Sequence, residues 1–351
     1  MNANAERALE AAGADVLVTA DPFTVGWLTG FAPDATSGPG AFAVPAIAVV
    51  RDGGVTLLCS TDEEPGVDPA RAAVVAYEGF TTAPLNQACC QVELLADLGL
   101  AGRIAVEAHA LSLAVSAVLP EARDVGTALR GLRAVKSADE LATLRRAVEV
   151  CDAGQAAART AVRAGRTELA AWNEIAGAME AAAGERLPML CDLVSGPRTA
   201  DIGGFPGDRV MAAGELVICD LVPRIGGMYG DSCATIAIGE PPAGARDAHA
   251  RAVDMLEQLL AAVRPGVVAG DLDRLGRSTG LGYPHHTGHG FGYCGHEEPR
   301  IVPDSPTVLA PGMVVALEPG TYPGPWGLRV EKLCVVTDTG CEVLSRHEVT
   351  L

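Results

Sequence analysis

The chain has 351 residues, of which 49% are hydrophobic and 20% charged, and its formal net charge is −18 at pH 7. This length suggests two domains with an ample core, and the acidic balance argues against nucleic acid and anionic membranes as partners. No apolar run is long enough to span a bilayer, and the N-terminus lacks the basic flank and apolar core of a signal peptide. We therefore expect a cytoplasmic protein.

Residues 1–128 predict a smaller α/β domain. Its expected elements are a helix over 6–13 and strands over 15–19, 46–50, 55–59 and 103–107. The second and third strands flank Arg51-Asp52-Gly53-Gly54, which is a strong hairpin signal. Trp27 to Phe31 reads as a packed aromatic turn or as a segment near a substrate.

Residues 129–351 predict a second domain that contains several helices. Ser137 and Glu140 have the spacing of a capping box, and an apolar stripe at helical spacing follows them. Further helices are expected over 167–183, 245–263 and 270–279, and a strand is expected over 187–194.

Two predicted hairpins in this second domain each carry a pair of carboxylates. Apolar runs at 216–222 and 231–238 flank a glycine-containing turn, and folding about that turn places Asp220 opposite Asp231. Runs at 314–318 and 328–336 flank a Pro/Gly turn, and here Glu318 comes to face Glu331. Residues directly opposite in an antiparallel pair share a face, with Cβ atoms about 5 Å apart.

This residue set predicts a metal site. Close carboxylates repel each other, and His289 lies between the two pairs in a glycine-rich stretch, with His285 and His296 at spacings of four and seven. Such a set suits two divalent ions about 3.5–4 Å apart, bridged by carboxylates and a hydroxide. Oxygen-rich ligands with one nitrogen favour Mn, Co, Fe or Zn. The alternative is that each acidic residue lies on a solvated face.

The cysteines point to a reducing compartment. Ten are scattered without a C-x-x-C motif, and most lie in apolar runs, as buried free thiols would. Cys233 is two residues from Asp231 on the same predicted strand, so both face the same way. Its plainer interpretation is a small packed side chain.

Several motifs in order resemble the pita-bread metallopeptidases, a family that includes methionine aminopeptidase, aminopeptidase P and prolidase, with creatinase as a metal-free relative. The matching segments are 132–145, 214–220, 230–235, 285–299, 317–322 and 328–331. The resemblance implies an α/β (α+β) fold, with a creatinase-like N-terminal domain (1–128) before a pita-bread catalytic domain (129–351). In that domain helices would cover the outer face of a curved antiparallel sheet, and the chain would act as a homodimer.

The resemblance also implies roles for individual residues. The metal ligands would be Asp220, Asp231, His289, Glu318 and Glu331. His296 and His285 match catalytic or substrate-orienting histidines, and Arg329 matches an arginine near the substrate. Glu318 is also our candidate proton shuttle. Two divalent ions are expected, with manganese ahead of cobalt, zinc or iron.

Two positions depart from the family pattern. Gly203 stands where proline-specific members carry a substrate-holding histidine, and Ala234 replaces an arginine. The first hypothesis is a hydrolase of C–N bonds of the Xaa-Pro dipeptidase or aminopeptidase type. The second is a specialised enzyme for a small-molecule amide or amidine on the same scaffold, including natural-product biosynthesis. A third is a metal-free binding module, against which the retained ligand set argues.

Overall fold

A computed structural model describes residues 2–32, 44–79, 82 and 86–351. The chain divides into two compact units, Met1–Arg133 (unit 1) and Ala134–Leu351 (unit 2). The sequence-based boundary after residue 128 lies inside helix α5 (Gly126–Ala134).

Unit 1 is built on a six-stranded sheet with the order β4-β3-β2-β1-β5-β6. The strands are β1 (Val16–Thr19), β2 (Ile47–Arg51), β3 (Gly54–Ser60), β4 (Ala73–Tyr77), β5 (Ile104–Val106) and β6 (Arg123–Asp124). Its other helices are α1 (Ala3–Ala12), α2 (Pro22–Thr29), α3 (Gln87–Asp97) and α4 (Leu113–Ala117). The predicted β2–β3 hairpin is confirmed, and Asp52 and Gly53 take the positive φ angles of its tight turn. Trp27 is fully buried in α2.

Unit 2 begins with the predicted capped helix. In α6 (Ala138–Ala161) the Ser137 side chain accepts from the Glu140 N–H while the Glu140 carboxylate accepts from the Ser137 N–H, so the capping box is confirmed. The remaining helices are α7 (Glu168–Ala183), α8 (Ala245–Ala262) and α9 (Ala269–Arg277), close to the predicted ranges.

The strands of unit 2 form two main sheets. The first has the order β10-β8-β7 and contains β7 (Met189–Ser195), β8 (Leu216–Ile225) and β10 (Ser232–Ala237), with β9 (Met228–Tyr229) paired to β8. The second has the order β12-β11-β13-β16-β17 and contains β11 (Gly288–Gly290), β12 (Glu297–Ile301), β13 (Val314–Leu317), β16 (Lys332–Val336) and β17 (Cys341–Val343). A separate two-stranded sheet pairs β14 (Gly320–Thr321) with β15 (Leu328–Arg329), and both strands lie between β13 and β16 in the sequence.

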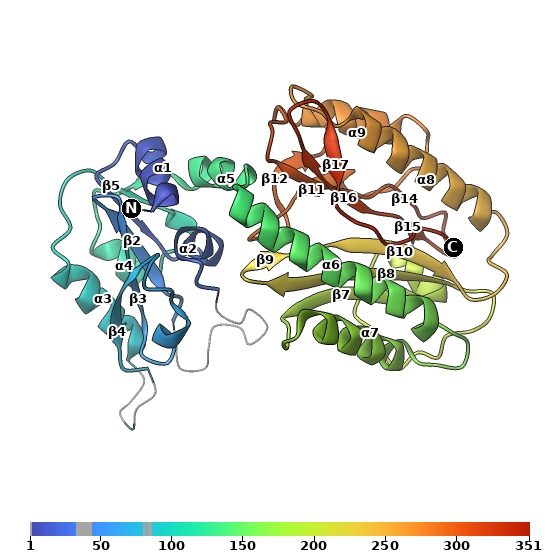
Figure 1. Cartoon of the computed structure of the whole chain (residues 1–351), viewed down its shortest axis with the longest axis horizontal. Helices are drawn as coiled ribbons and strands as arrows, with labels where there is room; N and C mark the ends of the chain where they lie inside the picture. The colour runs from blue at the N-terminus through green and yellow to red at the C-terminus, as the bar shows by residue number, and fades with distance from the viewer. Residues whose placement is uncertain (1, 33–43, 80–81, 83–85) are drawn as a thin grey trace. The chain divides into compact units, whose positions relative to one another are not determined.

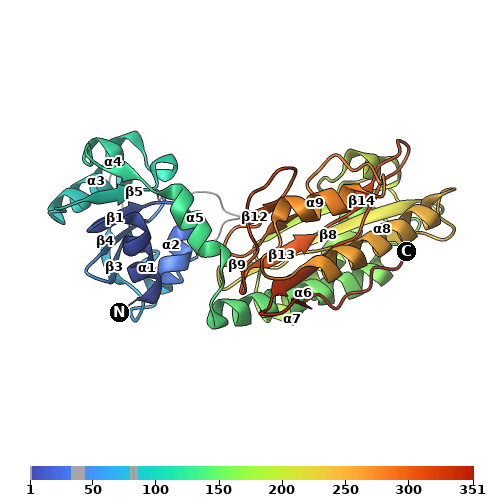
Figure 2. The ribbon, with the colours of Figure 1, turned by 90° about the horizontal axis from the view of Figure 1, so that it is seen from above.

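Helices cover these sheets from two sides. Helix α6 packs on β8 and β10 and α7 packs on α6, whereas α8 contacts β13 and α9 contacts β12 (Figure 1). Figure 2 shows the same helices from above. The apolar residues between α8, α9 and the second sheet form one core cluster, and those between α6, α7 and the first sheet form another. Each sheet is thus supported from its own helical layer.

The register of the first hairpin corrects one prediction. Asp220 pairs with Cys233, and the same register continues through the β8–β9 pairs to a turn at Gly226 and Gly227. Asp220 and Asp231 are therefore diagonal rather than directly opposite, although they share one face. The prediction treated the four residues 224–227 as the turn and therefore paired Asp220 with Asp231. In the structure the turn consists of two glycines with positive φ, which shifts the partner of Asp220 by two residues.

The second hairpin has the expected pairing. Leu317 pairs with Lys332, and Gly320 pairs with Arg329. Both pairs follow the same register, and continuing that register between them places Glu318 opposite Glu331. The two hairpins are joined where the Glu331 N–H donates to the Cys233 carbonyl.

Candidate metal centre

The five predicted ligands converge on one cavity of about 300 Å³. Its lining includes Asp220, Asp231, His289, Glu318 and Glu331, together with His296. Asp220 comes from within β8, and the other four lie within or at the ends of strands of both sheets. Residues separated by more than a hundred positions in the sequence thus share one space, which is large enough for a small ligand.

His289 has the orientation of a metal ligand. Its Nδ1 lies 3.0 Å from the Gly290 carbonyl oxygen, so Nδ1 carries the proton and Nε2 keeps its lone pair. Nε2 lies 3.4 Å from Glu318 Oε1 and 3.8 Å from Asp231 Oδ2. Burial lowers the pKa of His289 to about 3, which keeps the imidazole neutral and able to coordinate.

Three of the four carboxylates have raised pKa values. Burial raises the pKa of Asp220 to about 6, although the neighbouring Arg329 charge opposes this. Burial and the neighbouring carboxylates raise the pKa values of Asp231 and Glu331 well above those of ordinary acids. The protein alone therefore disfavours the charged form of each of these three groups.

Glu318 behaves in the opposite way. Burial raises its pKa, but the neighbouring His286, His289 and Arg329 outweigh burial and lower the pKa below its ordinary value. This carboxylate is compensated by protein groups, whereas Asp231 and Glu331 have acidic neighbours.

The remaining oxygens fit divalent cations. Within the described part of the chain, Asp220 Oδ1, Asp231 Oδ1 and Glu331 Oε1 are buried and have no hydrogen-bond donor. Leaving such oxygens unpaired is costly, and divalent ions would satisfy them and remove the mutual repulsion. Asp231, His289 and Glu331 already hold one potential ligand atom each within 4.8 Å of one another. The residues present therefore suit the metal that the sequence predicts.

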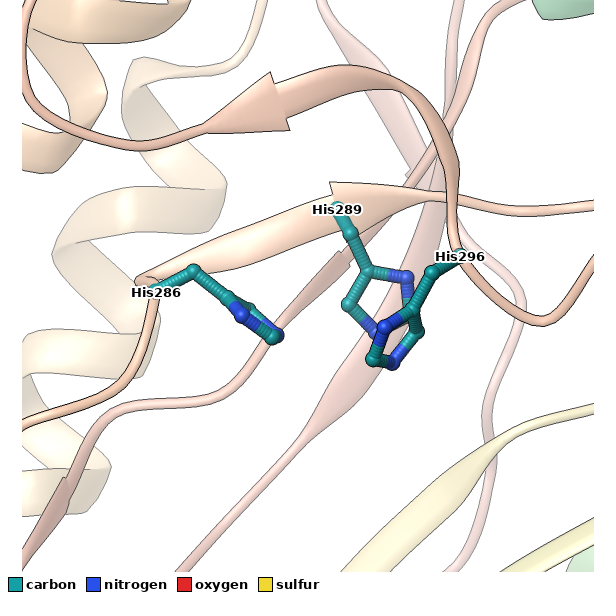
Figure 3. A group of neighbouring side chains, drawn as sticks. All are labelled: His286, His289 and His296. Atoms are coloured by element: carbon teal, nitrogen blue, oxygen red, sulfur yellow. The ribbon is translucent and has the colours of Figure 1, made fainter.

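His286 is a site residue that the sequence analysis left unassigned. Its Nε2 lies 2.6 Å from Glu318 Oε1, and its ring meets those of His289 and His296 edge-on, with centroids 5.2 Å apart in both cases (Figure 3). The Arg300 guanidinium donates to its Nδ1 at 3.1 Å, which places the imidazole proton on Nε2, facing Glu318. Adjacency to His285 was the only sequence signal.

His285 and Arg329 lie behind the cavity rather than in its lining. His285 contacts the Tyr322 hydroxyl through Nε2 at 3.1 Å. Arg329 is 3% exposed, and its guanidinium donates to Asp220 Oδ2 at 2.7 Å, to the Ile202 carbonyl and to the Tyr322 hydroxyl. In this structure both side chains are engaged by protein groups. Tyr322 is a further contact that the sequence analysis did not anticipate.

Thr235 and Cys233 lie on β10 next to the predicted ligands. The Thr235 hydroxyl donates to the Arg329 carbonyl and accepts from the Arg329 N–H, which fixes β10 against β15. Cys233 is fully buried, and burial raises the pKa of its thiol well above the ordinary value. A protonated thiol is a weak metal ligand.

Comparisons with known proteins identify relatives of this chain. The model of metallopeptidase family M24 matches residues 142–338. A probable dipeptidase PepE of Mycobacterium tuberculosis is 38% identical over 246 residues, which cover 66% of this chain and 64% of that protein. The match thus spans less than two thirds of that relative.

Solved structures extend the likeness to nearly the whole chain. Dipeptidase PepE from Mycobacterium ulcerans has a TM-score of 0.81 and 28% identity, covering 99% of this chain and 95% of that one. Prolidase from Pyrococcus furiosus has a TM-score of 0.80 and 24% identity, covering 97% and 99%. At that identity the prolidase supports the fold alone, and it confirms the predicted two-domain α/β architecture.

Proposed function

The chain belongs to metallopeptidase family M24, and we propose that it hydrolyses C–N bonds of small peptides, as an Xaa-Pro dipeptidase or aminopeptidase does. The observation that carries this proposal is the convergence of five ligand side chains from two hairpins and β11 on one cavity. The three unpaired buried carboxylate oxygens support a centre with two divalent ions. Ions held there would lower the pKa of bound water and polarise the scissile carbonyl.

The chain's own residues would then position the reaction. Asp220, Asp231, His289, Glu318 and Glu331, which all line the cavity, would hold the ions. His296 lines the cavity, and burial lowers its pKa, so its neutral imidazole can donate a hydrogen bond to the substrate carbonyl. Glu318 is the candidate group for carrying a proton to the leaving nitrogen, because it faces the same space.

His285 and Arg329 would act from behind these groups. Arg329 fixes Asp220 through its short guanidinium contact, and His285 lies with its Nδ1 3.8 Å from Glu318 Oε2. We propose that both keep the ligands and the bound substrate in one orientation, as the family resemblance suggests.

The proposal is tested by metal content and turnover together. Metal-depleted protein is reloaded with Mn, Co or Zn, the ions bound per chain are measured, and proline release from Xaa-Pro dipeptides is followed. Two ions per chain with metal-dependent release support the proposal. Protein that takes up ions but releases no proline from any peptide contradicts the peptidase activity, and protein that takes up no ions contradicts the metal centre as well.

A second candidate is hydrolysis of a specialised small-molecule amide on the same scaffold. Gly203 favours it, because the family resemblance implies a substrate-holding histidine at this position in proline-specific members. Screening small amides with metal-loaded protein separates the two candidates, since a dedicated amidase turns over its amide while leaving Xaa-Pro peptides intact.

We also propose manganese as the metal, a homodimer as the assembly and the cytoplasm as the location. The oxygen-rich donor set supports manganese, with cobalt, zinc or iron as alternatives. All ten cysteines are free thiols, which supports a reducing compartment. None of the described helices is long and apolar enough to cross a bilayer. Light scattering in solution tests the dimer.

A further inference from the structure

One carboxylate of the cavity wall lies outside the predicted ligand set. Asp192 is on β7, where it pairs directly with Asp220 on β8 and therefore points to the same face. It lines the cavity, and 36% of its side chain is exposed. A charged side chain thus reaches the space beside the predicted metal ligands without belonging to them.

Protein groups satisfy only part of this carboxylate. Asp192 Oδ1 accepts from the Gly204 N–H at 2.8 Å. Oδ2 lies 3.8 Å from Arg329 Nη2, beyond hydrogen-bond distance, and that nitrogen donates instead to Asp220. Among the described residues no hydrogen bond reaches Asp192 Oδ2, so this oxygen is available to a bound molecule.

Gly203 makes room for Asp192. A Cβ atom at Gly203 would overlap the Asp192 carboxylate, so the side chain of residue 192 fills the space that a side chain at residue 203 would need. The departure from the family pattern at Gly203 is therefore matched by a carboxylate in the same place.

The rest of the wall agrees with this polarity. Among the described residues that line the cavity there is no lysine or arginine. Leu190 and Phe205, which are 53% and 73% exposed, and Val222 supply apolar surface. An ammonium group on an apolar body would meet complementary chemistry at Asp192 and the apolar residues beside it.

We propose that Asp192 determines substrate specificity by accepting a hydrogen bond from a protonated amine of the substrate. Gly203 leaves the space that the Asp192 carboxylate occupies. The substrate class is a small peptide or amide whose free ammonium group adjoins an apolar side chain. This inference rests on the proposed function, because the scissile bond is taken to lie at the metal ligands.

The first experiment compares substrates that differ in the amine alone. Leu-Pro and N-acetyl-Leu-Pro are offered to metal-loaded wild type and to Asp192→Asn, whose amide oxygen can still accept from Gly204. Acetylation should lower kcat/KM of the wild type by about 10- to 100-fold, the effect of one charge-assisted hydrogen bond. Asp192→Asn should lose a similar factor on Leu-Pro and discriminate little between the two. Equal losses on both substrates would show a purely structural Asp192 and overturn the proposal.

Two further variants keep the result interpretable. Gly203→Ala should displace the Asp192 carboxylate and weaken the amine preference without altering residue 192. Asp201→Asn is the matched control, because Asp201 is exposed and is absent from the described cavity lining. A control variant that lost the preference as fully as Asp192→Asn would contradict the assignment.

A second experiment needs no catalysis. Binding of 3-methylbutylamine and of the neutral 3-methylbutanol is compared by protein NMR titration with metal-loaded protein. The amine should bind at least about tenfold more tightly to wild type and to Asp201→Asn, but not to Asp192→Asn. If this preference holds while no peptide is cleaved, the peptidase activity fails and the recognition stands. If amine and alcohol bind alike to wild type, the recognition fails whatever the turnover.

Discussion

The two hairpins of unit 2 carry the same kind of side chain in different electrostatic surroundings. At the second hairpin Glu318 and Glu331 follow one register. The neighbouring His286, His289 and Arg329 nevertheless lower the pKa of Glu318 against burial, whereas burial raises the pKa of Glu331. At the first hairpin Asp220 and Asp231 are diagonal, and burial raises both pKa values. His286, His289 and Arg329 thus lower the pKa of Glu318 despite burial, whereas burial outweighs Arg329 at Asp220, and Asp231 and Glu331 have acidic neighbours.

The carboxylates of the site therefore differ in whether protein side chains or bound ions would stabilise their charged forms. Glu318 is held by side chains that remain in place without metal, so its position should survive metal removal. Asp231 and Glu331 have unpaired oxygens and acidic neighbours, so their charged forms should be stable only when ions are bound. Variants at the two kinds of position should therefore respond differently.

The largest loss of activity is expected at the carboxylates whose charge the protein compensates least. Asp231→Asn and Glu331→Gln each remove a proposed ligand, and kcat/KM should fall by more than about 100-fold, since even residues behind metal ligands matter by about 10- to 100-fold. Bound metal per chain, measured by mass spectrometry, should fall in parallel. Glu257→Gln on the exposed face of α8 serves as the control. Full metal occupancy in both ligand variants would refute the assignment.

Asp220 offers a test through pH in the metal-free protein. Its pKa is 3.8 as an ordinary group and about 6 in the fold, so the folded state binds the extra proton between these values. Stability from this group is therefore present at low pH and is lost as pH rises through about 4 to 6, with a total near 3 kcal/mol. Asp220→Asn, which cannot ionise, should gain that much over metal-free wild type between pH 4 and 7.

Urea unfolding at a series of pH values measures this difference. Comparison with the wild type at each pH cancels the titration of histidines common to both proteins. With saturating manganese the order should reverse, because the variant lacks a proposed ligand. A pH-independent difference between the metal-free proteins would contradict the raised pKa.

Variants of His286 test whether this side chain holds Glu318 in its active orientation. His286→Ala removes the group facing Glu318 Oε1 and should lower kcat/KM by about 10-fold, within the range for residues that orient a ligand. His286→Gln can accept from Arg300 and donate to Glu318, so it should recover most of the activity. Both variants should retain bound metal. If alanine and glutamine behave alike, His286 does not act through its hydrogen-bonding groups.

The sequence predicted the parts of this site that depend on strand order and periodicity. Glycine turns and apolar runs identified both hairpins, and Glu318 and Glu331 fall in the predicted register. The register of the first hairpin was wrong because its tight turn involves two residues, and that choice is local backbone geometry. The position of Asp192 beside Asp220 depends on how β7 pairs with β8, a contact between segments that neither segment encodes alone. The proximity of His286 to Glu318 likewise arises from the tertiary fold.

The smallest effect is expected at Cys233, which tests whether sulfur contributes to the first hairpin's metal chemistry. Cys233 pairs with Asp220 across β8 and β10, and together with Glu331 these residues could offer ligand atoms to an ion. Burial, however, raises the pKa of the thiol well above its ordinary value, and coordination by sulfur requires the thiolate. Cys233→Ser should therefore change kcat/KM by no more than about threefold, with a loss of about 1 kcal/mol from imperfect packing. The cobalt-loaded wild type should lack a sulfur-to-cobalt charge-transfer band in the near ultraviolet. Such a band, absent in Cys233→Ser, would show that a bound ion overcomes the cost of ionising the buried thiol, and the first hairpin would then differ from the second in ligand type as well as in charge compensation.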